Sequence, residues 1–381
     1  MNLRFASLLL IGATHGFATS RQLSRLSDGG VSGFGFRRAD EQNQVNKSHE
    51  WPSMQPSSRL EGSIAQPPYV PDTSPAIQDM VKLLVELECE GLESEDSAVE
   101  IGFASTTGMR GVFAKEDLGV GEFLFAVPFP ATLTVLEDED ESTTDAYRGL
   151  TMLRKYLEPS VETQQWRPYL DSLPTIDFCF TPTPDFWSHD EINLLEFPRL
   201  VREALNRKEQ IRQLGTQEGV DCDKLQFATW LAKSRCFSIL KVREGRIKTK
   251  SVLIPFFDMI NHSSDQPNAA LQLVEAKAED ESFYAIVTTC AIPAGTEVVI
   301  SYGTSTDSSV EHLMNYGLLE ESNKFDVEML HFGGEGCLNR MDDWSTSLEE
   351  DERELLTAEG NTKTALAFRV RMKRAIQQMK L

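Results

Sequence analysis

The sequence predicts an α+β fold in which short strands at both ends of the folded region flank a long helical insert. Short apolar segments separated by glycine-bearing turns occur over residues 99–127 and again over residues 251–302. Between them, residues 144–241 carry apolar side chains mainly at helical spacing. No internal repeat interrupts this order. We therefore expect one sheet that is assembled from both ends of the chain.

Composition and charge limit the class of protein. The 381 residues are 40% hydrophobic and 25% charged, which is ordinary for globular proteins, and the length suits two or three lobes. A net charge of −22 argues against binding to nucleic acid and favours basic partners, although it also serves simply as a solubility surface. The six cysteines lack both disulfide density and zinc-ligand spacing, so we expect reduced thiols and no metal site.

The N-terminal residues 1–73 are expected to be a targeting presequence and a linker. Arg4 precedes the apolar run Phe5–Ala13, a signal-peptide pattern that is too short to span a membrane. A Ser- and Arg-rich segment beginning at Phe17 has transit-peptide composition. Together these features resemble the bipartite plastid presequence of algae with secondary plastids. The alternative is a disordered tail with a chance apolar run, which leaves the secretory pathway or the cytoplasm open as the location.

The folded region begins with a helix and continues as strands. An amphipathic helix opens at Ser74-Pro75 with one apolar stripe, formed by Ile77, Met80, Val81, Leu84 and Leu87. Three short strands follow, over Val99–Ala104, Gly111–Ala114 and Glu122–Val127. The acidic segment Leu136–Glu141 is expected to be a solvated surface loop.

The helical insert and the second group of strands follow the same rules. Ser188, with Glu191 three residues later, predicts a helix start, and Gly219–Asp223 predicts a break between two helices. The second of these helices has a buried face formed by Leu225, Ala228, Leu231, Ala232 and Cys236. Strands resume at Ser251 and include Leu271–Glu275, Ser282–Thr289 and Glu297–Tyr302, before a short helix that ends at Gly317.

Two compact pieces of sequence carry the chemistry. Asp258, Asn261 and His262 directly follow a buried apolar run, and Tyr302 ends a strand about forty residues later. Two such ends that meet would form a small polar site in an apolar wall, of acid–base or metal type by residue composition. The alternatives are a strand aromatic packed in a core for Tyr302 and a hydrogen-bonded core histidine for His262.

A glycine turn and an arginine are two further candidates for this site. Gly108-Met109-Arg110-Gly111 is a tight turn whose glycines would let a ligand approach the backbone, or else an ordinary hairpin turn. Arg235, near the end of a helix, either caps the last helical carbonyl groups or faces the segment around Asp258.

These segments, taken in order, resemble a known family. T-G-M-R-G-V-F-A, S-R-C-F, D-M-I-N-H-S, E-V-V-I-S-Y-G and Y-G-L are similar to segments of the SET-domain protein methyltransferases. W-R-P-Y-L-D-S-L-P and the long insert resemble the Rubisco large-subunit lysine methyltransferase group. The resemblance spans roughly residues 75–320. It implies a SET fold of short sheets with a pseudoknot over residues 74–130 and 246–320, interrupted by a helical insert over residues 131–245, with a short C-terminal helical segment over residues 321–381.

The resemblance also implies roles for individual residues. The cofactor would be S-adenosyl-L-methionine, and the catalytic residue would be Tyr302. The substrate channel would contain Phe237 and Tyr316. The cofactor-binding set would be Gly108, Met109, Arg110, Gly111, Arg235, Asp258, Asn261 and His262, in which Asp258 fixes the elbow. In-line methyl transfer needs a neutral, aligned amine and requires neither a metal nor a covalent intermediate.

The implied function is S-adenosylmethionine-dependent methylation of a lysine side chain by a monomeric enzyme acting on a protein substrate. Three departures concern Leu318, where the family has Phe, Asp307, where it has Asn, and a C-terminal lobe of only about sixty residues. Protein-histidine methylation is one alternative, against which Phe237 favours lysine. A catalytically inactive SET-fold binding module is another. The substrate protein and the degree of methylation are not predicted.

Overall fold

The structure is a computed structural model, and it describes most of the chain from residue 68 onward. The described residues are 4–6, 68–93, 97–139, 143–158, 160–175, 182–243, 246–276, 281–302, 307–320, 322–332 and 336–379. The predicted signal peptide and transit segment lie outside this part, apart from strand β1 (Arg4–Ala6). No helix among the described residues is long and apolar enough to cross a membrane.

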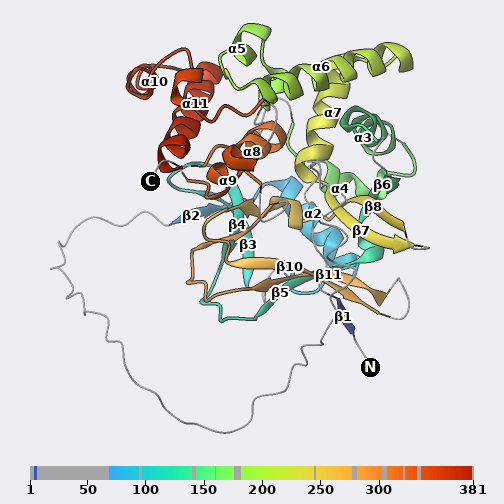
Figure 1. The fold of residues 1–381 in the computed structure, drawn as a ribbon. Helices are drawn as coiled ribbons and strands as arrows, with labels where there is room; N and C mark the ends of the chain where they lie inside the picture. The colour runs from blue at the N-terminus through green and yellow to red at the C-terminus, as the bar shows by residue number, and fades with distance from the viewer. Residues whose placement is uncertain are drawn as a thin grey trace, which may run out of the picture. The chain divides into compact units, whose positions relative to one another are not determined.

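The strands form three sheets (Figure 1). The first is antiparallel and has the order β1, β10 (Ala269–Glu275), β11 (Phe283–Thr288) and β5 (Phe123–Pro128). The second has the order β2 (Tyr69–Pro71), β3 (Val99–Ala104), β4 (Arg110–Ala114), β12 (Glu297–Ile300) and β9 (Asn261–His262). The third has the order β6 (Leu133–Glu139), β8 (Arg246–Leu253) and β7 (Phe237–Arg243). The expectation of one sheet was therefore wrong in number, but two sheets do join early strands to late ones.

Three sequence predictions about strands were wrong for tertiary reasons. The expected linker contains β2, because Tyr69 stacks on Phe113 at a centroid distance of 4.4 Å and the strand pairs with β3. The expected acidic loop largely belongs to β6, where Leu133 and Val135 are buried and the strand pairs with β8. Strands resume at Phe237 rather than Ser251, because β7 pairs along the whole of β8. In the first two cases pairing with a distant strand overrides local composition, whereas β7 pairs with the strand that follows it directly in the chain.

The helices follow the sequence signals more closely. The described helices include α2 (Pro75–Glu86), α3 (Asp145–Met152), α4 (Arg167–Leu170), α5 (His189–Asn193), α6 (Pro198–Glu218), α7 (Cys222–Arg235), α8 (Ser309–Tyr316), α9 (Phe325–Phe332), α10 (Leu348–Leu355) and α11 (Gly360–Gln378). Ser188 and Glu191 form the predicted capping box of α5. Gly219 ends α6 in the left-handed conformation, and Asp221 caps α7. Gly317 ends α8 in the same left-handed way, as predicted.

Two large hydrophobic cores and a small third cluster, which joins α3, α6 and α7, hold the described elements together. The larger one lies between the sheets and helices α2, α4 and α7, and it includes Met80, Phe125, Tyr169, Leu231 and Phe257. The second joins the insert to the C-terminal helices and includes Trp187, Phe197, Leu313, Phe368 and Ile376. The C-terminal segment is thus packed against α5, α6 and α8 through a core of its own.

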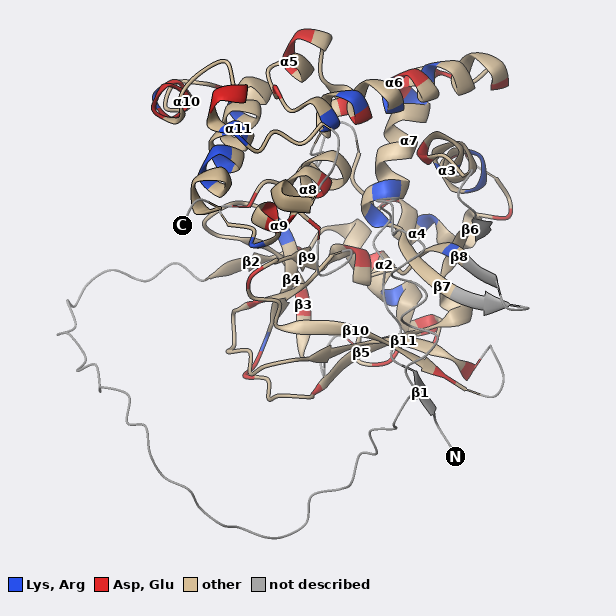
Figure 2. Cartoon of the chain, viewed as in Figure 1, with Lys and Arg blue, Asp and Glu red and all other residues tan. Residues whose placement is uncertain are grey.

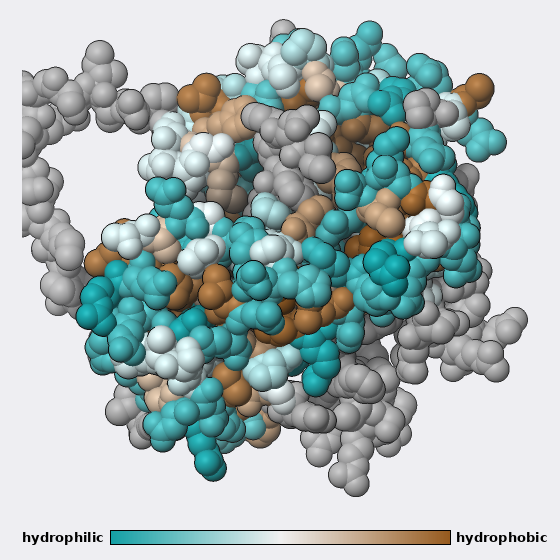
Figure 3. Space-filling view, turned by 90° about the horizontal axis from the view of Figure 1, so that it is seen from above, coloured by the Kyte–Doolittle hydropathy of each residue, from teal (hydrophilic) through white to brown (hydrophobic). Residues whose placement is uncertain are grey.

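Ion pairs also hold the C-terminal helices together. Lys and Arg residues lie along α11, where the ribbon is blue in Figure 2. Their side chains pair with acids of neighbouring elements, and Lys373 and Arg369 both bond to the buried carboxylate of Asp351. Seen from above, the surface is mostly hydrophilic, and hydrophobic residues adjoin one another across the middle of this face (Figure 3).

Candidate active site

The polar elbow lies directly against the end of strand β12. The buried run that leaves β8 turns at Phe256, whose φ of 71° is unusual for a residue with a side chain, and a short 3-10 turn follows over Phe257–Met259. The chain then pairs as β9 in parallel with β12, so that Asn261 lies opposite Val299. This pairing confirms the expectation that the two strand ends meet.

Tyr302 is fixed to the elbow at both its backbone and its hydroxyl group. Its backbone N–H donates to His262 Nδ1 at 2.8 Å, and its hydroxyl donates to the carbonyl oxygen of Ile260 at 2.5 Å. Burial raises the pKa of Tyr302 to about 12. The phenol is therefore neutral at physiological pH, and its oxygen keeps free lone pairs on the side away from Ile260.

The His262 ring has a positional role in the structure. Because Nδ1 accepts from Tyr302, the proton of the neutral imidazole lies on Nε2. Nε2 faces Ser264 Oγ at 2.9 Å and Glu320 Oε2 at 3.4 Å. Burial raises the pKa of Glu320, but its contact with His262 and its hydrogen bond from Ser264 outweigh this and lower it to about 2. Glu320 thus stays charged and favours the tautomer of His262 that accepts from Tyr302.

Arg235 faces the elbow, which decides between the two sequence interpretations. Its Nη1 donates to the carbonyl oxygen of Asp258. The Asp258 side chain is buried, accepts from the Tyr169 hydroxyl at 3.2 Å through Oδ2, and has a pKa raised by burial. Its Oδ1 has no hydrogen-bond partner among the described residues. Asp258 therefore fixes the elbow and also presents one unpaired oxygen.

The glycine turn between β3 and β4 is tied to the elbow through Asn261. Asn261 Nδ2 donates to the carbonyl oxygen of Arg110 at 2.8 Å and to Glu297 Oε1 at 2.6 Å. A Cβ at Gly111 would lie 2.2 Å from Glu297 Oε1, so a larger residue there would displace the Glu297 carboxylate. Gly108 has a φ of 68° and open space where a Cβ would be. The turn is thus a hairpin turn between paired strands, and the approach of a ligand to its backbone stays a prediction.

The two residues between these glycines have different surroundings. The Met109 side chain is half exposed. The Arg110 guanidinium donates to the carbonyl oxygen of Ser172 at 3.0 Å. The backbone of the turn, rather than its side chains, is therefore the part that faces Asn261.

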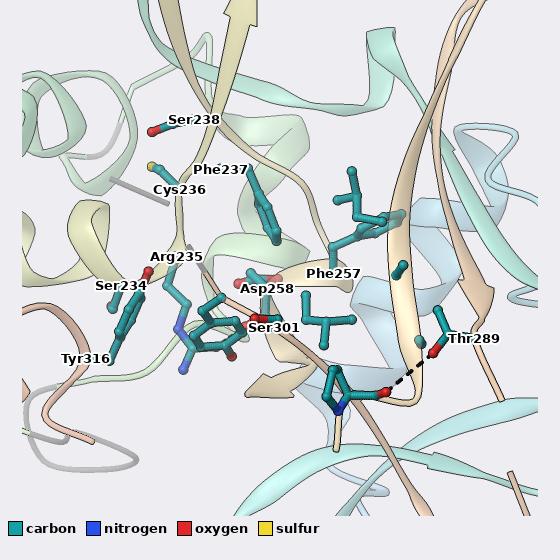
Figure 4. Close-up of a pocket in the computed structure, with 16 residues that line it drawn as sticks. Ser234, Arg235, Cys236, Phe237, Ser238, Phe257, Asp258, Thr289, Ser301 and Tyr316 are labelled. Carbon is teal, nitrogen blue, oxygen red and sulfur yellow. Dashed lines mark hydrogen bonds between the residues drawn. The ribbon is translucent and has the colours of Figure 1, made fainter. Parts of the chain in front are cut away.

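A pocket of about 280 Å³ brings five of the predicted residues together (Figure 4). They are Arg235, Phe237, Asp258, Tyr302 and Tyr316. In Figure 4 Arg235 lies between Tyr316 and Asp258. The turn Gly108–Gly111, Asn261 and His262 do not line this pocket. His262 is linked to it by the hydrogen bond from Tyr302, and Asn261 ties the turn to the elbow.

Tyr316 completes the aromatic side of the pocket. It ends α8, and its ring centroid lies 5.0 Å from that of Tyr302. Burial raises the pKa of its hydroxyl well above the ordinary value, so Tyr316 is neutral too. The two phenols present adjoining hydroxyl-bearing rings in an otherwise apolar wall.

Sequence reasoning missed other residues that line the pocket. Ser234 and Cys236 belong to the S-R-C-F segment, so their neighbours in sequence could have pointed to them. Leu271, Thr289 and Ser301 also line it, and they come from β10, the end of β11 and the residue before Tyr302. No local sequence signal marks Leu271 or Thr289, because only strand pairing brings them to the pocket.

Comparison with known proteins now places the chain in a family. The SET domain model matches residues 109–303, about half of the chain. The chain belongs to the SET-domain family. The SET fold of short sheets expected from the sequence is thereby confirmed. The expected pseudoknot stays a prediction, because residues 303–306 lie outside the described part of this SET protein.

Several proteins are similar in sequence to part of this SET protein. N-lysine methyltransferase setd6 of Salmo salar is 26% identical over 289 residues, which cover 63% of this chain and 58% of the relative. The chloroplastic [fructose-bisphosphate aldolase]-lysine N-methyltransferase of Arabidopsis thaliana is 24% identical over 241 residues, covering 56% and 47%. The chain thus spans less than three-fifths of the length of these relatives.

Solved structures resemble the fold of the SET protein. The SET domain of LSMT bound to lysine and AdoHcy matches with a TM-score of 0.58 and 18% identity, covering 81% of this chain and 91% of that one. Rubisco LSMT bound to AdoMet matches with a TM-score of 0.55 and 18% identity, covering 80% and 91%. At this identity the likeness concerns the fold.

Proposed function

We propose that this SET protein transfers a methyl group from S-adenosylmethionine to the side-chain amine of a lysine in a protein substrate. One observation carries the proposal. The neutral Tyr302 hydroxyl is held by the Ile260 carbonyl at the wall of a mostly apolar pocket that Phe237 and Tyr316 also line. The pocket meets the elbow and, through Asn261, the glycine turn. The similarity to proteins named lysine methyltransferases supports the same activity.

The residues around the pocket fit the cofactor. The turn Gly108–Gly111 has an open approach at Gly108, and the buried Asp258 Oδ1 has no partner among the described residues. The residues that would hold the cofactor are this turn, Arg235 and the Asn261-His262 pair. When bound, S-adenosylmethionine supplies a methyl group on a positively charged sulfur.

The side chains of the pocket suit an amine acceptor. A lysine amine has an ordinary pKa of about 10.4, and an apolar pocket lowers it because burial disfavours the charged form. The high pKa of Tyr302 excludes it as a general base at neutral pH. Its oxygen can instead accept from the amine and orient it, while Phe237 and Tyr316 exclude water. Alignment of this kind supplies several kcal/mol, up to about 7–11 in well-oriented reactions.

The alternatives fit the pocket less well. Phe237 lies on the pocket wall, where it adds apolar surface around a lysine chain rather than a polar partner for an imidazole. An inactive binding module would not need Tyr302 to be held by two hydrogen bonds, one from its backbone N–H and one from its hydroxyl.

Location and assembly form a separate part of the proposal. We infer import into a plastid, because residues 1–37 have bipartite presequence composition and one relative is chloroplastic. We also infer that the enzyme acts as a monomer. A fluorescent reporter fused behind residues 1–73 should accumulate in plastids, and retention in the secretory pathway or cytoplasm would contradict this inference.

The activity is tested by separating cofactor binding from methyl transfer. Calorimetry of the full chain should show binding of S-adenosylmethionine, and Tyr302→Phe should change that affinity less than about threefold, about 0.65 kcal/mol. With labelled cofactor and a plastid extract, Tyr302→Phe should lower labelling of the lysine at least about 100-fold, about 2.7 kcal/mol. The exposed Tyr147→Phe is the matched control. Absence of cofactor binding by the wild-type chain would refute the proposal, and labelled histidine in place of lysine would favour the histidine alternative.

A further inference from the structure

A cluster of two histidines and a glutamate lies behind Tyr302, outside the pocket. His262 of β9, His312 of α8 and Glu320 after α8 each turn one ligand-type atom toward the others, and these atoms lie within 4.8 Å of one another. Glu320 Oε2 is 3.4 Å from His262 Nε2 and 3.7 Å from His312 Nδ1. We propose that these three side chains bind a divalent transition-metal ion such as Zn²⁺, and that the bound ion displaces Tyr302 and inhibits the enzyme.

The spacing suits such an ion. Zinc binds histidine nitrogen and carboxylate oxygen at about 2.0–2.2 Å in tetrahedral geometry, which places two ligand atoms roughly 3.3–3.6 Å apart. The distances from Glu320 to the two histidines fall at or just above this range. Small rotations of the side chains therefore suffice to bring the three atoms around one ion, with water as a fourth ligand.

The cluster is also incompletely satisfied without a ligand. The His312 side chain is only 2% exposed, and neither its Nε2 nor Glu320 Oε2 has a hydrogen-bond partner among the described residues. Asn323 Nδ2 approaches His312 Nδ1 at 3.5 Å, a long contact that an ion would replace. An unpaired buried polar atom costs about 1–3 kcal/mol, so an ion that pairs Glu320 Oε2 recovers part of this cost.

Binding of the ion conflicts with the hydrogen bond that holds Tyr302. A neutral imidazole that binds metal through Nε2 carries its one proton on Nδ1. In the metal-free arrangement His262 Nδ1 instead accepts from the Tyr302 N–H at 2.8 Å. Moving the proton from Nε2 to Nδ1 would set two N–H groups against each other, so the backbone at Tyr302 must shift. Inhibition by the ion, unlike its binding, rests on the proposed methyltransferase function.

No local sequence pattern marks this set of ligands. The three residues are not closely spaced in the way of zinc-finger cysteines and histidines, and they come from β9, α8 and the segment after α8. Parallel pairing of β9 with β12 places His262, and the packing of α8 brings His312 to within a ring-centroid distance of 4.4 Å of it.

Titration of the full chain with Co²⁺, read by visible absorption, tests the site without any assay of activity. The wild-type chain should bind one more Co²⁺ ion than His312→Leu does, and Zn²⁺ should displace that ion. Glu320→Gln should weaken binding of the same ion at least about tenfold. The exposed His189→Leu should behave as wild type. Circular dichroism shows whether each variant is folded. If His312→Leu is unfolded, Glu320→Gln takes its place in the comparison with wild type. Equal Co²⁺ binding by wild type and both folded variants would overturn the site.

Labelling with S-adenosylmethionine then tests the consequence. Zn²⁺ at the concentration that fills the site should lower the wild-type rate at least about tenfold and leave the His312→Leu rate unchanged. Binding of Zn²⁺ without inhibition would overturn the coupling to Tyr302. A chain that binds the ion at this site yet never methylates any protein, even with a chelator present, would instead overturn the proposed function.

Discussion

Substitution of Gly111 by alanine tests the link between the glycine turn and the elbow most sharply. Gly111 does not have a positive φ, so an alanine there is strained by contacts alone. The added Cβ would lie 2.2 Å from Glu297 Oε1 and 2.9 Å from Asn261 Nδ2, both shorter than real contacts allow. The Glu297 carboxylate must therefore rotate away and release Asn261.

The structure sets the size of this effect. The bond from Asn261 Nδ2 to Glu297 Oε1 is 2.6 Å long and partly buried, and a hydrogen bond to a charged group contributes about 1.5–3 kcal/mol. Gly111→Ala should lower the free energy of unfolding by that amount, and Glu297→Ala should do the same. The double variant loses the same bond only once, because removal of the Glu297 side chain also removes the 2.2 Å clash. The 2.9 Å contact with Asn261 Nδ2 is present in both Gly111→Ala and the double variant, so it cancels in the coupling energy. The coupling energy should thus be about 1.5–3 kcal/mol.

Urea denaturation of the four proteins measures this coupling, and calorimetry measures the cofactor affinity. Gly111→Ala should weaken S-adenosylmethionine binding at least about tenfold, or 1.4 kcal/mol, because it moves Asn261. Gly121→Ala is the matched control, since its φ of 78° makes the strain purely conformational, about 1–2 kcal/mol, with nothing near the new Cβ. If the double variant loses the sum of the two single effects, the clash with Glu297 does not exist.

Three further predictions concern stability. The pKa of Glu320 is about 2 in the folded protein, below the value of about 4.3 expected in the unfolded chain. Ionised Glu320 therefore stabilises the fold above about pH 4.3, and this stabilisation is lost as the pH falls toward 2. In Glu320→Gln the free energy of unfolding should depend less on pH over that range. Asp351→Ala should cost about 3–5 kcal/mol by urea denaturation, because it leaves the buried Lys373 unpaired, whereas the more exposed Glu352→Ala should cost less than about 1 kcal/mol. Ser188→Ala removes the cap of α5 and should cost about 1 kcal/mol; a cost near zero would mean that the capping box contributes nothing.

Local signals predicted the helices and their ends well. Capping at Ser188 and the left-handed glycines Gly219 and Gly317 involve residues only a few positions apart, so the printed sequence contains all the information that they need. The strand at residues 133–139 was missed for the opposite reason. Its acidic end resembles a loop, and only pairing with β8 makes it a strand.

The site divides in the same way. Short sequence segments, through their resemblance to the SET-domain family, pointed to Tyr302, Arg235, Asn261 and His262, whereas residue types alone left their roles open. The direction of Arg235 and the tautomer of His262 depend on atoms contributed by other segments, so they required the folded chain. Glu320 and its contact with His262 likewise depend on how α8 packs, since chain order says nothing of a distance across the fold.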